Sequence, residues 1–317
     1  AITSTGQQLI KFTADIGNKF YTKELKKDKD YCIYTDTDST FFSSLPLIES
    51  RYPDYDITDE KWMADKTIEI ADEVQGFINR SYDIYGKRFH NVDTHRFDIK
   101  QENVAKAGLW IAKKRYAQWI INVEGHTVSK LDVKGLDVVR SSFPPSFRKF
   151  MAEILEDILN DIDKVDLDQK ILDFKEHMKT LPLIEVMFPI GVKNVKKYTR
   201  KGDEPFAPRM KGTPVHVKSA LNYNDMLRQH KIKTIRGIIN GEKIKWTYLK
   251  NNNMGLDTMA LKGYEDPDPI YKFVEQYINH DKVFKSAFEN KLNDFYKAMK
   301  WGKVPENNNL GKFFAFG

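Results

Sequence analysis

The sequence predicts an α+β protein, in which an antiparallel sheet with helices on one face is followed by a mainly helical domain. Apolar side chains recur at helical spacing over residues 3–25 and 60–85. β-branched and aromatic runs flank Asp36–Asp38 and fill residues 108–123. From Pro144 onward, helical spacing dominates, and proline is tolerated in the first turn of a helix.

The elements of the first part follow in order. A helix over residues 3–25 precedes two short strands on either side of Asp36–Asp38. Residues 60–85 form a second amphipathic helix. Extended segments near 93–103 and 108–123 are expected to join the hairpin in one sheet.

The second part begins with a helix in which apolar residues repeat from Phe147 to Leu159. Another helix is expected around 167–180, and a long amphipathic helix from Val283 to Met299. We expect these aromatic stripes to be core rather than ligand sites. Residues 193–218 contain three prolines and are expected to form loop and strand.

Composition favours a soluble intracellular protein that binds anions. The 317 residues are enough for two domains with cores of their own. Apolar residues make up 41% and charged residues 30%, which is ordinary for a globular chain. No apolar run has membrane-spanning length, and the first residues lack a signal-peptide pattern. Cys32 is the only cysteine, which excludes an intrachain disulfide and makes a zinc cluster implausible.

The positive charge is concentrated in one region. The net charge is +6, and between residues 193 and 218 only Asp203 and Glu204 oppose eight basic residues. Such a surface suits nucleic-acid phosphates, and the alternative is a solvated flexible loop. The eight are Lys193, Lys196, Lys197, Arg200, Lys201, Arg209, Lys211 and Lys218.

Tyr34-Thr35-Asp36-Thr37-Asp38-Ser39 is the first motif that indicates chemistry. In an extended chain, side chains two positions apart lie on the same side. A strand, tight turn and returning strand would therefore present Asp36 and Asp38 at one point. Mg²⁺ takes few protein carboxylates and completes its shell with water and substrate phosphates. The plain alternative is an Asp-rich β-turn without a metal.

Lys113-Lys114-Arg115-Tyr116 is the second motif, and it follows an extended run. Lysine is a point charge for phosphates and a donor to base acceptors, whereas tyrosine adds a flat amphipathic ring. The alternative is a basic strand end on a solvated surface.

Together the two motifs resemble family B DNA polymerases, with the tailed-bacteriophage replicative branch as the nearest likeness. The first resembles the palm motif that holds the catalytic metals, except that Thr35 replaces the family's usual glycine. The resemblance implies that Asp38 is the principal ligand and Asp36 a supporting one, for two Mg²⁺ ions. The second resembles the element that contacts the primer–template minor groove through Lys113, Lys114, Arg115 and Tyr116.

Weaker likenesses extend the resemblance over nearly the whole chain. Asp132–Arg140 is similar to the stretch that opens the thumb, which implies DNA contacts for Lys134 and Gly135. Gly212–Lys218 is similar to the thumb segment near the duplex. The thumb residues expected to contact DNA are Lys211, Thr213, His216 and Lys218. On this basis residues 1–140 are the C-terminal part of a palm and residues 141–305 a thumb.

Other elements of a complete family B polymerase are not found in this sequence. They are an upstream palm aspartate, the fingers lysines that hold the triphosphate, and an exonuclease carboxylate set. We therefore expect a C-terminal portion that requires an N-terminal polymerase part, either as one of two naturally separate chains or as a fragment. Glu102, on an expected palm strand, is a further candidate metal ligand, and a surface salt bridge is its alternative.

Residues 306–317 resemble the tail peptide by which replicative polymerases bind a sliding clamp. An aliphatic residue precedes paired aromatics, so one short turn would gather an apolar plug. The alternative is that these side chains fold back on the thumb. The expected clamp contacts are Leu310, Phe313, Phe314 and Phe316.

The expected function is template-directed nucleotidyl transfer to a primer 3′-hydroxyl during viral DNA replication, in the cytoplasm of an infected bacterial host. Primer–template DNA, deoxynucleoside triphosphates, the N-terminal part and a sliding clamp are the expected partners, and no membrane is expected. Two alternatives stay open. One is a catalytically inactive accessory protein derived from a polymerase that binds DNA and the clamp. The other is a metal-dependent nuclease or phosphotransferase, which needs a further acidic ligand within this chain.

Overall fold

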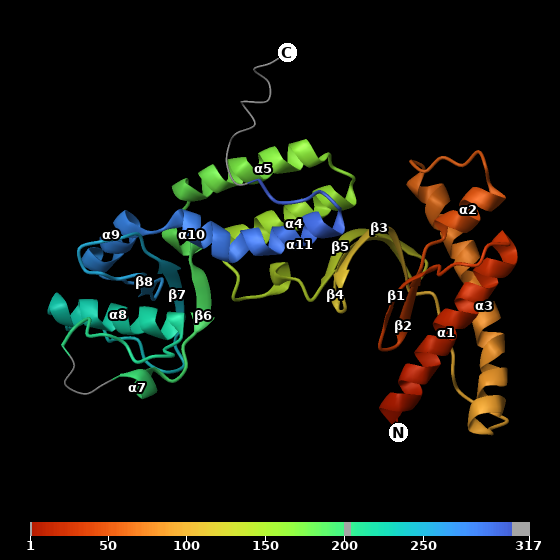
Figure 1. Cartoon of the computed structure of the whole chain (residues 1–317), viewed down its shortest axis with the longest axis horizontal. Coiled ribbons are helices and arrows are strands. Elements are labelled where there is room, and N and C mark those ends of the chain that lie inside the picture. The colour runs from red at the N-terminus through yellow and green to blue at the C-terminus, as the bar shows by residue number, and fades with distance from the viewer. Residues whose placement is uncertain (1, 200–203, 306–317) are drawn as a thin grey trace, which may run out of the picture. The chain divides into compact units, whose positions relative to one another are not determined.

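The computed structural model describes residues 2–199 and 204–305, and the chain divides into two compact units, Ala1–Gly135 and Leu136–Gly317 (Figure 1). Both units mix helices with small antiparallel sheets, which confirms the predicted α+β class. The hairpin and the later strands were expected to join in one sheet, but they form two separate sheets. The residues expected to bind a clamp (Leu310, Phe313, Phe314, Phe316) lie outside the described residues.

The first unit contains helices α1, α2 and α3 and two separate sheets. One sheet pairs β1 with β2, and the other has the order β3-β4-β5, with antiparallel neighbours throughout. The elements are α1 (Ile2–Leu25), β1 (Cys32–Asp36), β2 (Ser39–Phe42), α2 (Leu45–Arg51), α3 (Glu60–His90), β3 (Asn103–Ala112), β4 (Arg115–Val123) and β5 (His126–Lys134).

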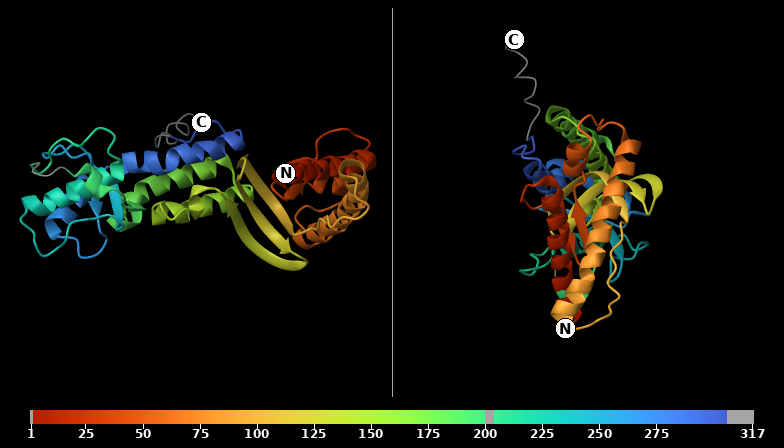
Figure 2. Two further views of the ribbon diagram at one scale, coloured as in Figure 1. Left: turned by 90° about the horizontal axis from the view of Figure 1, so that it is seen from below. Right: turned by 90° about the vertical axis from the view of Figure 1, so that its right-hand side faces the viewer.

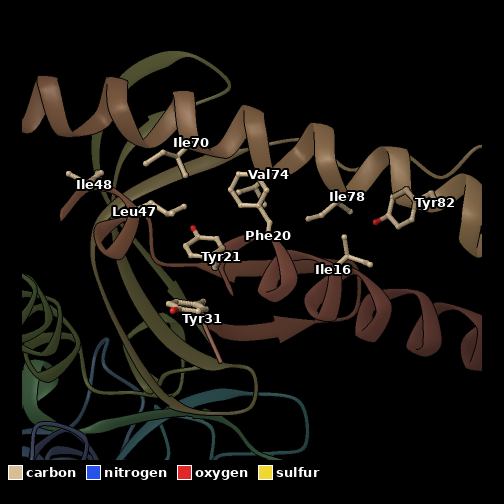
Figure 3. Packing of buried hydrophobic residues seen from close by; sticks show 10 residues of the cluster. All are labelled: Ile16, Phe20, Tyr21, Tyr31, Leu47, Ile48, Ile70, Val74, Ile78 and Tyr82. Carbon is tan, nitrogen blue, oxygen red and sulfur yellow. The ribbon is translucent and has the colours of Figure 1, made fainter. Parts of the chain in front are cut away.

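The core of the first unit lies where α1 meets α3. The right-hand view of Figure 2 shows the two helices side by side. In Figure 3, Phe20 of α1 points toward Val74 and Ile78 of α3. These side chains follow the helical spacing of the sequence, so one stripe of each helix is removed from water. The buried cluster also includes Ile16, Tyr21, Tyr31, Leu47, Ile48, Ile70 and Tyr82.

Helix α3 is longer than the predicted 60–85 segment. Its start is fixed by Asp59, whose carboxylate accepts a hydrogen bond from the Trp62 amide at 3.0 Å. Such a cap satisfies one of the unpaired N–H groups of a first helical turn. The helix ends at Asn91, which adopts the left-handed conformation typical of a helix C-terminus.

Residues 93–102 were expected to be part of the sheet, but they form no strand. Polar side chains of α3 take up the backbone groups that a neighbouring strand would otherwise satisfy. Asn79 accepts from the Ile99 amide at 2.9 Å and donates to the Ile99 carbonyl at 2.9 Å. Gln75 accepts from the Gln101 amide at 2.7 Å. The segment is therefore held against the helix, and the sheet begins only at Asn103.

The second unit is mainly helical, with one sheet of order β6-β7-β8. Both pairs of neighbours in this sheet are antiparallel. The regular elements are α4 (Pro145–Leu159), α5 (Lys164–His177), α6 (Leu183–Val186), β6 (Phe188–Gly191), α7 (Val195–Tyr198), α8 (Val215–Gln229), β7 (Lys243–Tyr248), β8 (Thr258–Leu261), α9 (Asp268–Tyr277), α10 (His280–Phe284) and α11 (Asn290–Ala298), with short 3₁₀ turns at Asp137–Val139 and Met178–Thr180.

The predicted helices of this unit form, with local differences. Helix α4 begins at Pro145, where the missing N–H group of proline loses no hydrogen bond because a first-turn N–H has no partner within the helix. Helix α5 begins at Lys164, earlier than residue 167, because Asp163 accepts from the Val165 amide at 2.7 Å. The predicted helix at 283–299 is a run from α10 to α11 with a π-helical turn at Lys285–Glu289. Helices α4, α5 and α11 lie alongside one another in Figures 1 and 2.

The region from 193 to 218 contains more helix than the predicted loop and strand. Its described parts include the short helix α7 and the first turn of α8. The rest of its described length, between Glu204 and Pro214, forms turns and irregular chain. Across 2–199 and 204–305, none of the helices is both long and apolar enough to cross a bilayer.

Candidate active site

The β1–β2 hairpin ends in a tight turn that carries both aspartates of the first motif. Asp36 is the last residue of β1 and pairs with Ser39, so Thr37 and Asp38 form the turn. One carboxylate oxygen of Asp36, Oδ1, accepts from the Thr37 amide at 2.8 Å and from its hydroxyl at 3.1 Å. Asp38 is exposed and forms no hydrogen bond or ion pair within the part of the chain that the structure describes.

The second motif forms the tip of the β3–β4 hairpin. Ala112 pairs with Arg115, which leaves Lys113 and Lys114 as the exposed turn. Lys114 adopts a left-handed backbone conformation, with φ of 60°. A non-glycine residue rarely adopts this conformation unless surrounding contacts hold it there.

Those contacts come from the first hairpin, so the two motifs meet. The Lys114 amide donates to the Tyr34 hydroxyl at 2.8 Å. The Lys114 ammonium donates to Oδ1 of Asp36 at 2.7 Å and lies 3.3 Å from the Thr37 hydroxyl. Folding thus joins a catalytic carboxylate candidate to a basic residue 78 positions later in the chain.

An aromatic cluster underlies this junction. The ring of Tyr34 lies 5.5 Å from that of Tyr116, and Phe41 lies 5.8 Å from Tyr116. Trp110 contacts both Phe41, at 5.9 Å, and Tyr116, at 6.3 Å. The rings come from β1, β2, β3 and β4, so they fasten the two hairpins to each other. Stacked, tilted and edge-on aromatic pairs of this kind contribute about 0.5–1.5 kcal/mol each beyond their buried area.

The N-terminal end of β1 is fixed to helix α1. The side-chain oxygen of Asn18 accepts from the amides of Tyr31 and Cys32, at 2.8 and 3.0 Å. Its side-chain nitrogen donates to Asp30 at 2.8 Å. One asparagine therefore fixes where the strand starts, and with it the position of the aspartates at the strand's other end.

The charges at the tip influence each other's ionisation. Hydrogen bonds from Lys114 and from Thr37 hold the pKa of the Asp36 carboxyl below its usual value. Reciprocally, Asp36 raises the pKa of the Lys114 ammonium, and Asp38 adds a smaller contribution in the same direction. Both carboxylates are therefore close enough to Lys114 to act on it.

The donor set at the tip fits a magnesium ion. Both oxygens of Asp38 and the Oδ2 oxygen of Asp36 accept no hydrogen bond from residues 2–199 or 204–305, and the Asp36 side chain is 20% exposed. Hard carboxylate oxygens, one or two per ion, are what Mg²⁺ binds in nucleotide-handling sites. Among the described residues no group of three or more His, Cys, Asp or Glu is arranged to hold a metal ion.

Glu102 does not reach this tip. It precedes β3 at the end opposite Lys113, where its carbonyl accepts from the Glu124 amide at 2.8 Å. The ten residues of β3 lie between the two ends, and a strand of that length spans roughly 30 Å. We therefore do not carry Glu102 forward as a metal ligand.

The other predicted DNA-contacting residues of this unit divide into exposed and buried ones. Lys134 and Gly135 lie at the end of β5 beside Lys114, because Tyr116 pairs with Lys134 across the sheet. Lys134 is exposed and also pairs with Asp132 at 3.1 Å. Tyr116 is only 7% exposed, so in this structure it packs beneath the tip rather than presenting a free ring.

The predicted thumb residues lie together at the start of α8. Lys211 is exposed, and the Thr213 hydroxyl donates to the Met210 carbonyl at 2.7 Å. His216 is half-buried, and burial lowers its pKa. Lys218 donates to Asp257 at 2.8 Å, so its charge is already paired.

Tyr34 and Asn18 position this site but were not predicted to do so. Tyr34 belongs to the first motif, where it resembles any β-prone aromatic. Its hydrogen bond to Lys114 joins residues 80 positions apart, and no local pattern indicates it. Asn18 is one of many polar residues in α1, so no local signal indicated its role.

Sequence comparison assigns the chain that carries these hairpins to a known protein family. The chain belongs to DNA polymerase family B, whose sequence profile matches residues 1–199. It is 23% identical over 323 residues to the DNA-directed DNA polymerase of Escherichia phage RB69, covering 95% of this chain and 34% of that protein.

Two further relatives are similar over shorter lengths. The DNA polymerase of Paramecium bursaria Chlorella virus NY2A is 28% identical over 201 residues, which cover 61% of this chain and 19% of that protein. The catalytic chain of DNA polymerase alpha from the yeast Saccharomyces cerevisiae is 35% identical over 95 residues, covering 29% of this chain and 6% of the yeast protein. The chain thus spans about one third of the length of the phage polymerase and less of the others.

Proposed function

We propose that this chain supplies the carboxylate hairpin, the primer-contacting hairpin and the thumb of a template-directed DNA polymerase. The observation that carries the proposal is the 2.7 Å contact between the Lys114 ammonium and Asp36. It places the basic tip that would hold a primer terminus next to the carboxylates that would hold metal. Neither motif alone requires that arrangement, whereas nucleotidyl transfer does.

In this proposal Asp38 is the principal ligand for Mg²⁺, and the Oδ2 oxygen of Asp36 supports it. When bound, two Mg²⁺ ions lower the pKa of the primer 3′-hydroxyl and stabilise charge on the attacking and leaving oxygens. Lys114 keeps the Asp36 carboxyl ionised and fixes its orientation. The tight Thr37–Asp38 turn holds the second carboxylate at a fixed distance from the first.

The basic residues at the second hairpin would hold DNA. Tyr34 fixes the backbone of the Lys113–Lys114 turn, so the exposed Lys113 ammonium would need little reordering to meet a phosphate or a base edge. The Lys114 ammonium would have to exchange its contact with Asp36 for one with DNA. Lys134 adds a third positive charge beside them. None of these contacts reads base identity alone, so the template base selects the nucleotide.

The remaining parts of the enzyme would come from an N-terminal polymerase part. That part would bring the further palm carboxylate, the fingers that bind the deoxynucleoside triphosphate, and the exonuclease. The alignment with about a third of the phage polymerase supports this division. We assign residues 1–140 to the palm and 141–305 to the thumb, and we place the reaction in viral DNA replication in the cytoplasm of an infected bacterium.

Primer extension tests the proposal. The chain is mixed with primer–template, triphosphates and Mg²⁺, with and without the N-terminal part. We expect extension by the mixture only, and its loss in Asp38→Asn. Asp54→Asn, at an exposed turn of the same unit, is the matched control and should retain activity.

A calorimetric titration with Mg²⁺ gives a second measurement that does not depend on turnover. Asp38→Asn should weaken binding, and Asp54→Asn should not. Extension that survives Asp38→Asn at the wild-type rate would refute the assignment of that carboxylate.

The inactive accessory protein is the second candidate. Thr35 stands in the place of the family's usual glycine, and Asp36 is already engaged by a lysine. This candidate predicts duplex binding without extension in the same mixture, and no effect of Asp38→Asn on replication. DNA degradation by the chain alone, without triphosphates, would instead indicate the nuclease.

We further propose that residues 306–317 bind a sliding clamp through Leu310, Phe313, Phe314 and Phe316. The support is the spacing of an aliphatic residue and paired aromatics. Deleting 310–317 should abolish stimulation by the clamp on long templates and leave extension of short primers intact. Equal loss of both activities would refute this role.

A further inference from the structure

A buried carboxylate in the second unit holds the loop that carries Lys211. Asp225, on helix α8, is 1% exposed, and its side chain accepts from three donors. The backbone amide of Phe206 donates to Oδ2 at 2.8 Å, and Arg209 donates to the same oxygen at 2.5 Å. Arg228 forms a close ion pair with the other oxygen. A buried carboxylate with this many partners is fully satisfied.

Two of these donors belong to the same irregular segment, residues 204–214. Phe206 has a left-handed backbone conformation, with φ of 64°, which is strained for a bulky aromatic residue. The bond from its amide to Asp225 helps to hold it in that conformation. Arg209 also donates to the side-chain oxygen of Asn222, one turn earlier on α8, at 2.9 Å. The segment is thus fixed to the helix at two points.

Lys211 follows immediately in a compact turn. The Thr213 amide and hydroxyl both donate to the Met210 carbonyl, at 3.1 and 2.7 Å. Gly212 has φ of 82°, as the third position of such a turn requires. Lys211 is left exposed at the second position, and no ion pair holds its ammonium within the described residues. Lys218, on the first turn of α8, is instead paired with Asp257.

We propose that Asp225 is a positioning residue that holds the Lys211 turn in place for a DNA phosphate without touching DNA itself. This inference rests on the proposed function, because it takes duplex DNA as the ligand of Lys211. The connection runs from Asp225 through Arg209 to the Met210–Thr213 turn. Without Asp225, the loop loses both of its attachments to that carboxylate, and Lys211 no longer has a fixed position.

The salt dependence of duplex binding tests the proposal on the full chain. Affinity for a primer–template duplex is measured by fluorescence anisotropy over a series of NaCl concentrations. Lys211→Ala should lower the slope of log affinity against log salt by about 0.9, the value for one phosphate contact. Asp225→Asn should lower it by the same amount. The double variant should show no further loss, because both changes remove one contact.

The direction in which Asp225→Asn changes the affinity for duplex DNA separates a positioning role from simple electrostatics. Removing a negative charge strengthens binding to a polyanion when geometry is unchanged, whereas loss of positioning weakens it. Asp166→Asn, at an exposed position of α5, makes the same charge change away from the loop and should not weaken binding. Hydrogen exchange of residues 204–214 without DNA should accelerate in Asp225→Asn and not in Asp166→Asn.

Arg209→Lys is the second variant, in case Asp225→Asn fails to fold. It retains the charge, but its ammonium ends one atom short of the guanidinium nitrogen that bonds Asp225 and Asn222. It should reproduce the loss of slope and the faster exchange.

The outcomes that overturn the inference are distinct from those that overturn the proposed function. An unchanged or higher affinity in folded Asp225→Asn, together with a loss in Lys211→Ala, refutes positioning and leaves the DNA contact standing. An unchanged slope in Lys211→Ala refutes the contact and the positioning with it. Absence of salt-dependent duplex binding by the wild-type chain refutes the proposed function itself.

Discussion

Gly135 gives the sharpest test of how the Lys114 tip is held. It follows β5 with φ of 66°, a conformation that costs an L-residue about 1–2 kcal/mol. A Cβ atom at this position would lie 2.0 Å from the Lys114 carbonyl oxygen. Contacts between carbon and oxygen are normally above about 3.3 Å, so Gly135→Ala must separate the two backbones by more than about 1 Å.

That displacement acts directly on the contacts of Lys114. Its backbone hydrogen bond to Tyr34, which contributes roughly 0.5–1.5 kcal/mol net, would be lost or weakened. The contact of its ammonium with Asp36 would be displaced as well. With the backbone cost of about 1–2 kcal/mol included, the free energy of unfolding should fall by about 1.5–3.5 kcal/mol. A displacement of about 1 Å in a positioning group can slow a reaction roughly 10²-fold. We expect a loss of that order in single-turnover nucleotide addition by the assembled enzyme.

Gly125→Ala is the matched control. Gly125 lies in the β4–β5 turn of the same sheet with φ of 85°, and a Cβ atom there would meet nothing within 4 Å. It carries the same kind of backbone cost without the clash, so it should lose about 1–2 kcal/mol of stability and no activity. Thermal or urea unfolding supplies the stabilities. If the two variants are equally stable and equally active, the steric explanation for Gly135 is wrong.

Three further predictions concern ionisation. Lys114→Met should raise the pKa of the Asp36 carboxyl toward its usual value, because the hydrogen bond from Lys114 is the largest cause of its depression. NMR titration of the carboxyl group measures this pKa, and an unchanged value in the variant would contradict the contact. Burial lowers the pKa of His216 and His280, so the unfolded state binds protons that the folded state does not, and stability should decrease as pH falls through about 6.5. Urea unfolding at several pH values tests this, and the double variant His216→Gln/His280→Gln should flatten the dependence. Burial, assisted by Asp30, raises the pKa of the Cys32 thiol from 9.0 to about 11. At pH 7.5 a thiol reagent should therefore modify it about 100-fold more slowly than a free cysteine, and rapid labelling of folded protein would refute this.

Local patterns were sufficient for the hairpin and for the approximate positions of α1, α3, α4, α5 and the run from α10 to α11. The acidic turn lies between β-prone runs, and the helices carry stripes of apolar residues, so their approximate positions follow from the 2- and 3.6-residue periods. Helix ends differed where a cap decides them: Asp163 begins α5 earlier than predicted, and Asn91 ends α3 later than predicted. The two motifs could be identified, but the contact between Asp36 and Lys114 could not, because it depends on packing between segments far apart in sequence.

The same limitation explains the differences at particular residues. Residues 93–102 look extended, but Asn79 and Gln75 on α3 satisfy their backbone. Tyr116 belongs to a DNA-contacting motif, yet the rings of Phe41 and Trp110 cover it. Asp225 resembles any acidic helical residue until folding brings Phe206 and Arg209 to it.

The sheet that carries the two aspartates has only two strands. An isolated pair of strands is marginally stable in water, so its rigidity has to come from elsewhere. Phe42 of β2 stacks on Tyr21 at 5.6 Å, and a Cβ atom at Gly17 would fall within its ring. The position of the proposed metal-binding tip therefore depends on helix α1, which packs against the hairpin. Substitutions such as Gly17→Ala should therefore shift the two aspartates at the tip, although they lie in the hydrophobic interior.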